Sequence, residues 1–234
     1  MNGETIINKL IALRNPEKAE VLSSFFQTKK GEYAAGDVFL GVTVPQNRKV
    51  AAPYTHLPLL EVEKLLQSKY HESRFVALVI LVDKFERGNK ATKEAVYNFY
   101  LNHTQRINNW DLVDVSSYKI VGSWLLDKDR AILYDLAKST WLWDQRIAIV
   151  STMAFIRNHE FEDTLRLSEY FLTHTHHLIH KACGWMLREV GKRNKATLTQ
   201  FLNNYAPQMP RMMLRYSIEK LSKEERKSYL RTLI

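Results

Sequence analysis

Basic residues and a tryptophan recur in this sequence at intervals of about 35 residues. Trp110 follows Arg74 by 36 residues, and Arg146 follows Trp110 by the same step. Lys181 comes 35 residues after Arg146, and Arg215 comes 34 residues after Lys181. Four of these five positions carry a positive charge. If they lie on one surface, the resulting basic strip suits the phosphate backbone of a nucleic acid.

A carboxylate and a second tryptophan stand one helical turn after two of these positions. Asp114 follows Trp110 by four residues, and Trp185 follows Lys181 by the same spacing. A helix places such pairs on one face. A carboxylate can activate water for hydrolysis, and an indole face attracts a cation. The strip therefore contains groups suited to binding a nucleic acid and to hydrolytic chemistry.

Simpler roles for the same residues remain open at this stage. A tryptophan in a helix commonly packs in the core. Asp111 stands in the first turn of its segment, where an acidic side chain caps a helix or favours its dipole. Asp114 lies deeper in that segment and is less easily explained as a cap. The lysine and arginine side chains at the repeated positions can also pair with carboxylates of neighbouring repeats.

The elements that must position these residues are helices. From Glu4 onward, apolar residues recur mostly at helical spacing. A second helical segment accompanies several of the repeated positions, namely residues 61–69 before Arg74, and residues 129–138 and 163–173 between later positions. A period near 35 residues with two helices per repeat predicts an all-α protein of stacked helical hairpins, of the HEAT-like or ARM-type α-α superhelix class.

The composition is consistent with this class and limits the others. The 234 residues include 8 glycines and 6 prolines, which favours helices with short connections over a many-stranded fold. The net charge of +9 favours a polyanionic partner. The glycine-bearing segment Gln27–Val44 is expected to be a loop. A single cysteine, Cys183, and the absence of a long apolar run predict a cytoplasmic protein without a membrane span.

Five segments resemble the bacterial DNA alkylation-repair glycosylase family (AlkD-type). The resemblance covers nearly the whole chain, and the segments occur in the order expected for the family. They are Phe25–Lys49, Asn108–Gly122, Trp141–Ser151, His180–Lys192 and Pro210–Leu221.

This resemblance implies a single alkylation-repair domain over residues 1–234, folded as a C-shaped solenoid of HEAT-like repeats. The implied partner is alkylated duplex DNA, bound by a monomer. The implied enzyme is a monofunctional DNA glycosylase that hydrolyses the N-glycosidic bond of positively charged purines such as N3-methyladenine and N7-methylguanine. Members of the family resemble other glycosylases in outcome but do not need to flip the base into a pocket. The reaction needs no metal or organic cofactor.

The resemblance also assigns roles to individual residues. Asp114 matches the catalytic aspartate, while Trp110 and Trp185 match the tryptophans of the site. Arg146 matches an arginine that contacts DNA. Phe26 departs from the family, because some members carry a tyrosine there, so Phe26 is left out of the catalytic set. The periodic strip adds three expected DNA-binding residues: Arg74, Lys181 and Arg215.

Other readings remain for the chain and for one histidine cluster. A family member that binds DNA structure without catalysis is the main alternative, and a helical-repeat scaffold for proteins is a second one. The cluster His174, His176, His177 and His180 includes an i,i+4 pair, but no third ligand is apparent for zinc. We expect no metal there. The preferred alkylated base and the oligomeric state are not determined by the sequence.

Overall fold

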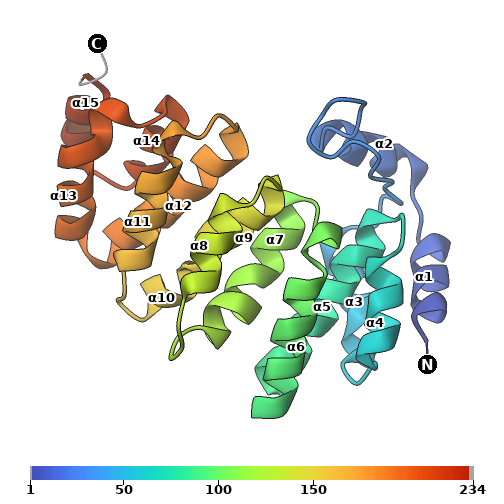
Figure 1. Ribbon diagram of the computed structural model, residues 1–234. Helices are drawn as coiled ribbons and strands as arrows, with labels where there is room; N and C mark the ends of the chain where they lie inside the picture. Colours follow the sequence, from blue (N-terminus) through green and yellow to red (C-terminus); the bar gives the residue numbers. More distant parts are fainter. Residues whose placement is uncertain (1, 232–234) are drawn as a thin grey trace. The chain divides into compact units, whose positions relative to one another are not determined.

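The protein is all-helical over the part of the chain that the computed structural model describes, residues 2–231. Within that part, the ribbon consists of helices and their connections (Figure 1), and the β-structure is an isolated parallel bridge between Val38 and Tyr70. Contacts between Cα atoms divide the chain into two compact units, Met1–Ile120 and Val121–Ile234. The all-α fold predicted from the period is confirmed.

The N-terminal unit is built around one long buried helix. That helix, α5, packs against α3, α4, α6 and α7, and most of its side chains are buried. Asparagine side chains at the N-caps of α1, α2 and α6 accept hydrogen bonds from the first turn, which satisfies otherwise unpaired backbone donors. The helices are α1 (Gly3–Ala12), α2 (Pro16–Phe25), α3 (Val44–Ala51), α4 (Leu59–Leu66), α5 (His71–Arg87), α6 (Lys90–Asn102) and α7 (Trp110–Ser117), with short 3₁₀ turns η1 (Ala52–Tyr54) and η2 (Thr104–Arg106).

The connection between α2 and α3 is the predicted glycine-bearing loop. Its three glycines, Gly31, Gly36 and Gly41, all have positive φ angles. Gly41 also lies against α2, because a Cβ atom there would come within 2.2 Å of the carbonyl oxygen of Asn15. The loop is therefore fixed against α2 at a position where only a glycine fits.

The C-terminal unit is likewise arranged around one long helix, α12, which packs against α9, α11, α13 and α14. Gly184 allows the close approach of α14, since a Cβ atom there would lie 2.5 Å from Cβ of Tyr216. The helices are α8 (Ala131–Lys138), α9 (Leu142–Ser151), α10 (Met153–Arg157), α11 (Glu162–Tyr170), α12 (His177–Arg193), α13 (Lys195–Tyr205), α14 (Arg211–Ser217) and α15 (Lys223–Arg231), with 3₁₀ turns η4 (Phe171–Thr173) and η5 (Ala206–Gln208). A π-helical segment, η3 (Tyr118–Gly122), spans the boundary between the units.

The predicted repeat matches the order of the helices. The five periodic positions fall on five different helices: α5, α7, α9, α12 and α14. The second helical segments of the predicted repeat form α4, which precedes α5, and α8 and α11 with η4, which lie between later positions. The assignment of residues 1–234 to a single domain stays a prediction, because the contacts divide the chain into two units.

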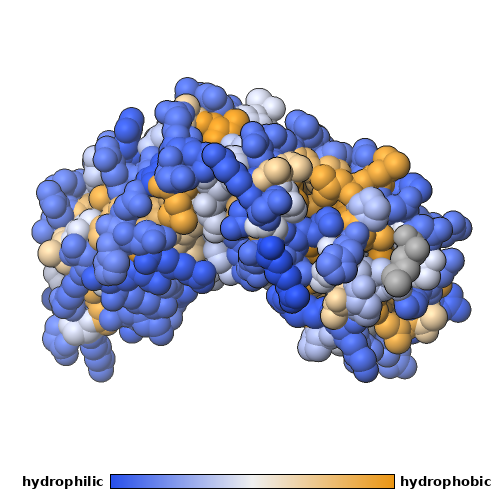
Figure 2. Space-filling model, turned by 90° about the horizontal axis from the view of Figure 1, so that it is seen from below, coloured by the Kyte–Doolittle hydropathy of each residue, from blue (hydrophilic) through white to orange (hydrophobic). Residues whose placement is uncertain are grey.

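The face of the molecule that Figure 2 shows is mostly polar. Hydrophilic side chains predominate on this face, and hydrophobic ones gather in separate patches. None of the helices that the structure describes is both long enough and apolar enough to cross a bilayer.

Candidate active site

Trp110 and Asp114 lie one turn apart on α7, in the N-terminal unit, and both are half-buried. The buried side chain of Asn109 caps this helix by accepting a hydrogen bond from the backbone nitrogen of Trp110 at 2.8 Å. The cap fixes the start of α7. The structure thus brings together the first tryptophan and the aspartate that the sequence analysis selected.

The indole ring of Trp110 is held by aromatic side chains at the end of α2. The ring of Phe26 stacks on it, with centroids 5.1 Å apart and planes 16° apart. Phe26 in turn stacks on Phe39 at 5.0 Å, and Phe39 stacks on the imidazole of His71 at 4.4 Å. Aromatic stacking of this kind restricts the orientation of each ring. Phe26 therefore supports Trp110, although the sequence analysis left it out of the site.

A buried histidine ties α7 to α5 and to the loop before α3. His71 stands at the start of α5, and its Nε2 atom lies 2.8 Å from Oδ2 of Asp111. Its Nδ1 atom lies 3.1 Å from Oδ2 of Asp37, which belongs to the loop. One imidazole ring thus connects three segments that are distant in the sequence.

Asp37 is the second centre of this buried network. Its Oδ1 atom forms a 2.6 Å ion pair with Arg74 and accepts a hydrogen bond from Asn108. Its Oδ2 atom accepts a hydrogen bond from the side chain of Asn109, the residue that caps α7. A buried carboxylate is costly unless it is paired and hydrogen-bonded, and these partners meet that requirement.

The network favours a protonated His71. Burial alone would lower the pKa of His71, but the charge of Asp111, with hydrogen bonds to Asp111 and Asp37, raises this pKa to about 9. Burial works to raise the pKa of Asp37, but the hydrogen bond with His71 and the charge of Arg74 outweigh it. The pKa of Asp37 therefore lies below its ordinary value. At neutral pH a positive imidazolium lies between two carboxylates.

The remaining predicted residues belong to the C-terminal unit. Lys181 and Trp185 lie one turn apart on α12, and both are half-buried. Arg215, on α14, is exposed. Arg146, on α9, is 5% exposed, and its guanidinium donates a 2.6 Å hydrogen bond to the carbonyl oxygen of Leu178.

The burial of two arginines changes the reading of the basic strip. Arg74 is 3% exposed, and its guanidinium bonds to Asp37 and to the carbonyl oxygen of Ser68. A side chain enclosed in this way has a structural role in the folded protein, and the expected contact of Arg74 with DNA stays a prediction. Arg146 is similarly enclosed, and its hydrogen bond to Leu178 connects α9 to α12. Of the four expected basic contacts, Lys181 and Arg215 have accessible side chains.

The histidine cluster makes local contacts at the start of α12. His174 contacts the side-chain oxygen of Gln145 at 2.9 Å through Nε2 and accepts a hydrogen bond from the backbone of His176 through Nδ1. Burial, followed by the nearby charges of His177, His174, His180 and Arg146, lowers the pKa of His176 to about 4. Among the described residues, no group of three or more His, Cys, Asp or Glu side chains has the arrangement of a metal site. Burial raises the pKa of the Cys183 thiol.

The predicted site residues do not include the three ionisable residues His71, Asp37 and Asp111 of this network. The local sequence offered no sign that His71 and Asp37 meet, since they are 34 positions apart and neither belongs to a recognisable spacing. Asp111 was considered as a helix cap. Its position in the first turn of α7 was a usable signal, but its contact with His71 depends on tertiary packing.

Comparisons with known proteins concern the chain as a whole. The sequence profile of a family described as DNA alkylation repair enzyme matches residues 6–221. Among solved structures, the chain is similar to a protein described as a predicted DNA alkylation repair enzyme from Enterococcus faecalis. The two share 21% sequence identity with a TM-score of 0.71, over 90% of this chain and 97% of that chain. At this identity the likeness concerns the fold. No curated protein matches the chain.

Proposed function

Because this chain belongs to the family of DNA alkylation repair enzymes, we propose that it is a DNA glycosylase that excises alkylated purines from duplex DNA. The proposed substrates are positively charged bases such as N3-methyladenine and N7-methylguanine. The enzyme acts as a monofunctional hydrolase and leaves an abasic site.

The observation that carries this proposal is the pairing of Asp114 with Trp110 on one face of α7. The cap at Asn109, the Phe26 stack and the bridge from His71 to Asp111 all fix the first turn of this helix. Such support matters for catalysis, because a catalytic carboxylate and its neighbours act through precise orientation. Because the first turn of α7 is held by these contacts, the helix is suited to orienting Asp114 and Trp110 for catalysis.

The chemistry matches these residue types. An alkylated purine is a cation, so its departure needs little acid assistance. The N-glycosidic bond breaks with its electron pair passing to the base, which neutralises the base and leaves positive charge on the sugar. Asp114 stabilises this oxocarbenium-like sugar and accepts a proton from the attacking water, whose oxygen forms the new bond to C1′. The face of Trp110 attracts the cationic base and the developing charge.

We assign binding of the DNA backbone to the accessible basic side chains of the C-terminal unit. Lys181 and Arg215 are the proposed phosphate contacts of this unit, and Trp185, one turn from Lys181 on α12, is proposed as an aromatic contact for the DNA. Arg74 is left out of this set because its side chain is buried. Arg146 is assigned an indirect role, which is to hold the start of α12 through Leu178.

The decisive experiment is single-turnover release of bases from duplex DNA that contains N7-methylguanine. We compare the wild type with Asp114→Asn and with Asp135→Asn, a control that changes an exposed aspartate on α8. We expect Asp114→Asn to bind DNA normally while excision falls at least about a hundredfold, the usual contribution of a general base. Asp135→Asn should match the wild type.

Two results would change the assignment. If the wild type binds DNA with steep salt dependence but releases no base from substrates carrying either adduct, the protein is a DNA-binding member of the family without catalysis. If borohydride traps a covalent adduct between protein and DNA, the reaction includes a Schiff-base step by a lysine, and the monofunctional assignment is wrong.

A further inference from the structure

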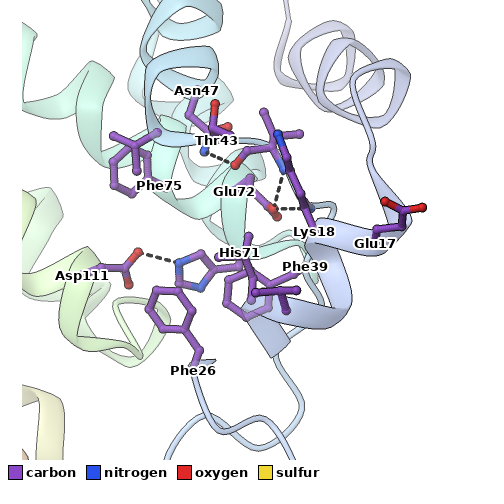
Figure 3. A pocket seen from close by; sticks show the side chains of 15 residues that line it. Glu17, Lys18, Phe26, Phe39, Thr43, Asn47, His71, Glu72, Phe75 and Asp111 are labelled. Atoms are coloured by element: carbon purple, nitrogen blue, oxygen red, sulfur yellow. Dashed lines mark hydrogen bonds and ion pairs between the residues drawn. The ribbon is translucent and has the colours of Figure 1, made fainter. Parts of the chain in front are cut away.

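The N-terminal unit contains a pocket of about 480 Å³ beside the aromatic stack. Its walls are largely apolar and come from α2, the loop, α3 and α5, including Val21, Leu22, Phe26, Phe39, Val42 and Phe75 (Figure 3). The volume lies within the range of roughly 300–1,000 Å³ that is typical of pockets for small molecules. Trp110 and Asp114 do not line this pocket, although His71 and Asp111, which hold the first turn of α7, do.

A buried carboxylate lines the pocket without a cationic partner. Glu72 is 2% exposed, and its oxygens accept hydrogen bonds of 2.8 to 3.2 Å from the backbone nitrogens of Leu40, Gly41 and Val42. Because all these partners are donors, the side chain acts as a carboxylate. No described lysine, arginine or histidine forms a salt bridge with it, so its negative charge is stabilised by backbone dipoles alone.

Two further acceptors among the lining residues lack hydrogen-bond partners. Asn47 is 3% exposed, and its amide donates to the carbonyl oxygen of Val42, whereas its Oδ1 atom has no partner among the described residues. The Oδ1 atom of Asp111 is also buried and has no partner in the described part of the chain. Buried polar atoms are nearly always satisfied, so these two oxygens, on residues that line one pocket, suit a ligand that donates hydrogen bonds.

The charges around the pocket favour a cation. Glu17, Glu72 and Asp111 contribute three negative charges, and Lys18 and His71 contribute two positive ones. Asp111 and His71 neutralise each other through their 2.8 Å contact. Lys18 and Glu17 are both exposed at the mouth of the pocket. The excess charge therefore belongs to the buried carboxylate of Glu72.

We propose that this pocket binds a small cation with an apolar body and N–H donors, in the manner of an aromatic or aliphatic ammonium ion. The apolar walls surround the body of the ligand. The negative charge of Glu72 favours a positive ligand, and the acceptor oxygens of Asn47 and Asp111 favour one with N–H donors. The exposed apolar side chains of Val21 and Val44 line the mouth. Ligand binding in this pocket requires neither DNA nor Asp114, so it can be tested apart from the proposed excision of bases.

The test is a binding series in which one apolar body carries different head groups. Benzylamine, benzyl alcohol, toluene and benzoate share the ring and differ in charge and donors. Binding to the full-length protein without DNA is measured by protein-observed NMR. We expect benzylamine to bind at least about tenfold more tightly than toluene or benzyl alcohol, and benzoate to bind most weakly.

Two variants locate the site. Val21→Trp places a large ring at the mouth of the pocket, and Leu60→Trp is its matched control, because both positions are 67% exposed and Leu60 does not line the pocket. We expect Val21→Trp to abolish benzylamine binding and Leu60→Trp to leave it unchanged. Equal binding of toluene and benzylamine would overturn the proposal, and so would tighter binding of benzoate or unchanged binding to Val21→Trp. Because DNA is absent, none of these results depends on glycosylase activity.

Discussion

The Nε2 atom of His71 lies 2.8 Å from Oδ2 of Asp111, so the first turn of the helix that carries Trp110 and Asp114 is bonded directly to α5. The other ring nitrogen of His71 contacts Asp37 in the loop. A protonated imidazole is the only form of histidine that donates from both nitrogens. This bridge therefore depends on pH.

Stability is expected to fall as the pH rises from neutral to alkaline values because of His71. Its pKa in the folded protein, about 9, exceeds the ordinary value of 6.5. Its contribution is therefore fully present below pH 6.5 and is lost as the pH rises through 9. The shift corresponds to about 3 kcal/mol in the free energy of unfolding. Urea denaturation between pH 6 and pH 9.5 measures this decline.

His71→Gln removes the titrating group, so the variant should be less stable at pH 6 and should show a much flatter dependence on pH. His56→Gln is the matched control, since His56 is exposed, and it should follow the wild type. A decline of equal steepness in His71→Gln and the wild type would show that other groups cause it.

Phe26 is expected to matter more than its neighbour Phe25. Phe26 is buried and stacks on both Trp110 and Phe39, whereas Phe25 is exposed and meets Trp110 by an edge contact at 6.1 Å. Phe26→Leu should lower the free energy of unfolding by about 2 kcal/mol and slow excision, because the indole loses its support. Phe25→Leu should change stability by less than about 0.5 kcal/mol. Urea denaturation and single-turnover excision test this, and equal effects of the two variants would refute it.

Arg74 and Arg215 are expected to behave differently although both stand at repeated positions. Arg74→Ala leaves Asp37 without its ion pair and should cost about 3 kcal/mol of stability. Arg215→Ala should leave stability nearly unchanged and lower the slope of log K against log salt for DNA binding by about 1. Denaturation and salt titrations of DNA binding measure both. A reduced salt slope in a folded Arg74→Ala protein would contradict the structural role.

The loop before α3 provides a test of close packing. Gly36 and Gly41 both have positive φ angles, but a Cβ atom on Gly36 meets nothing within 4 Å, whereas one on Gly41 overlaps the backbone of α2. Gly36→Ala should cost about 1 kcal/mol from backbone strain alone. Gly41→Ala should cost clearly more, because the backbone of Asn15 must also move. Thermal denaturation of the two variants compares these effects. Equal losses of stability would show that the backbone of Asn15 moves away from the added methyl group at little cost.

The sequence by itself determined the helices and their order. Apolar spacing and the period near 35 residues depend on local sequence, so the five repeated positions fall on five different helices as predicted. The pairing of Trp110 with Asp114 also followed from the sequence, because the spacing of four residues fixes a shared helical face. The resemblance to DNA alkylation repair enzymes agrees with the family match.

Only the tertiary structure decided which charges are accessible. Arg74 and Arg215 are the same residue type at corresponding positions, yet one is buried against Asp37 and the other is exposed. The difference arises because burial depends on partners that are distant in the chain, such as a loop aspartate 37 residues before Arg74. The bridge through His71 has the same origin. Helical spacing fixes which residues share a face, whereas packing between helices fixes what that face meets.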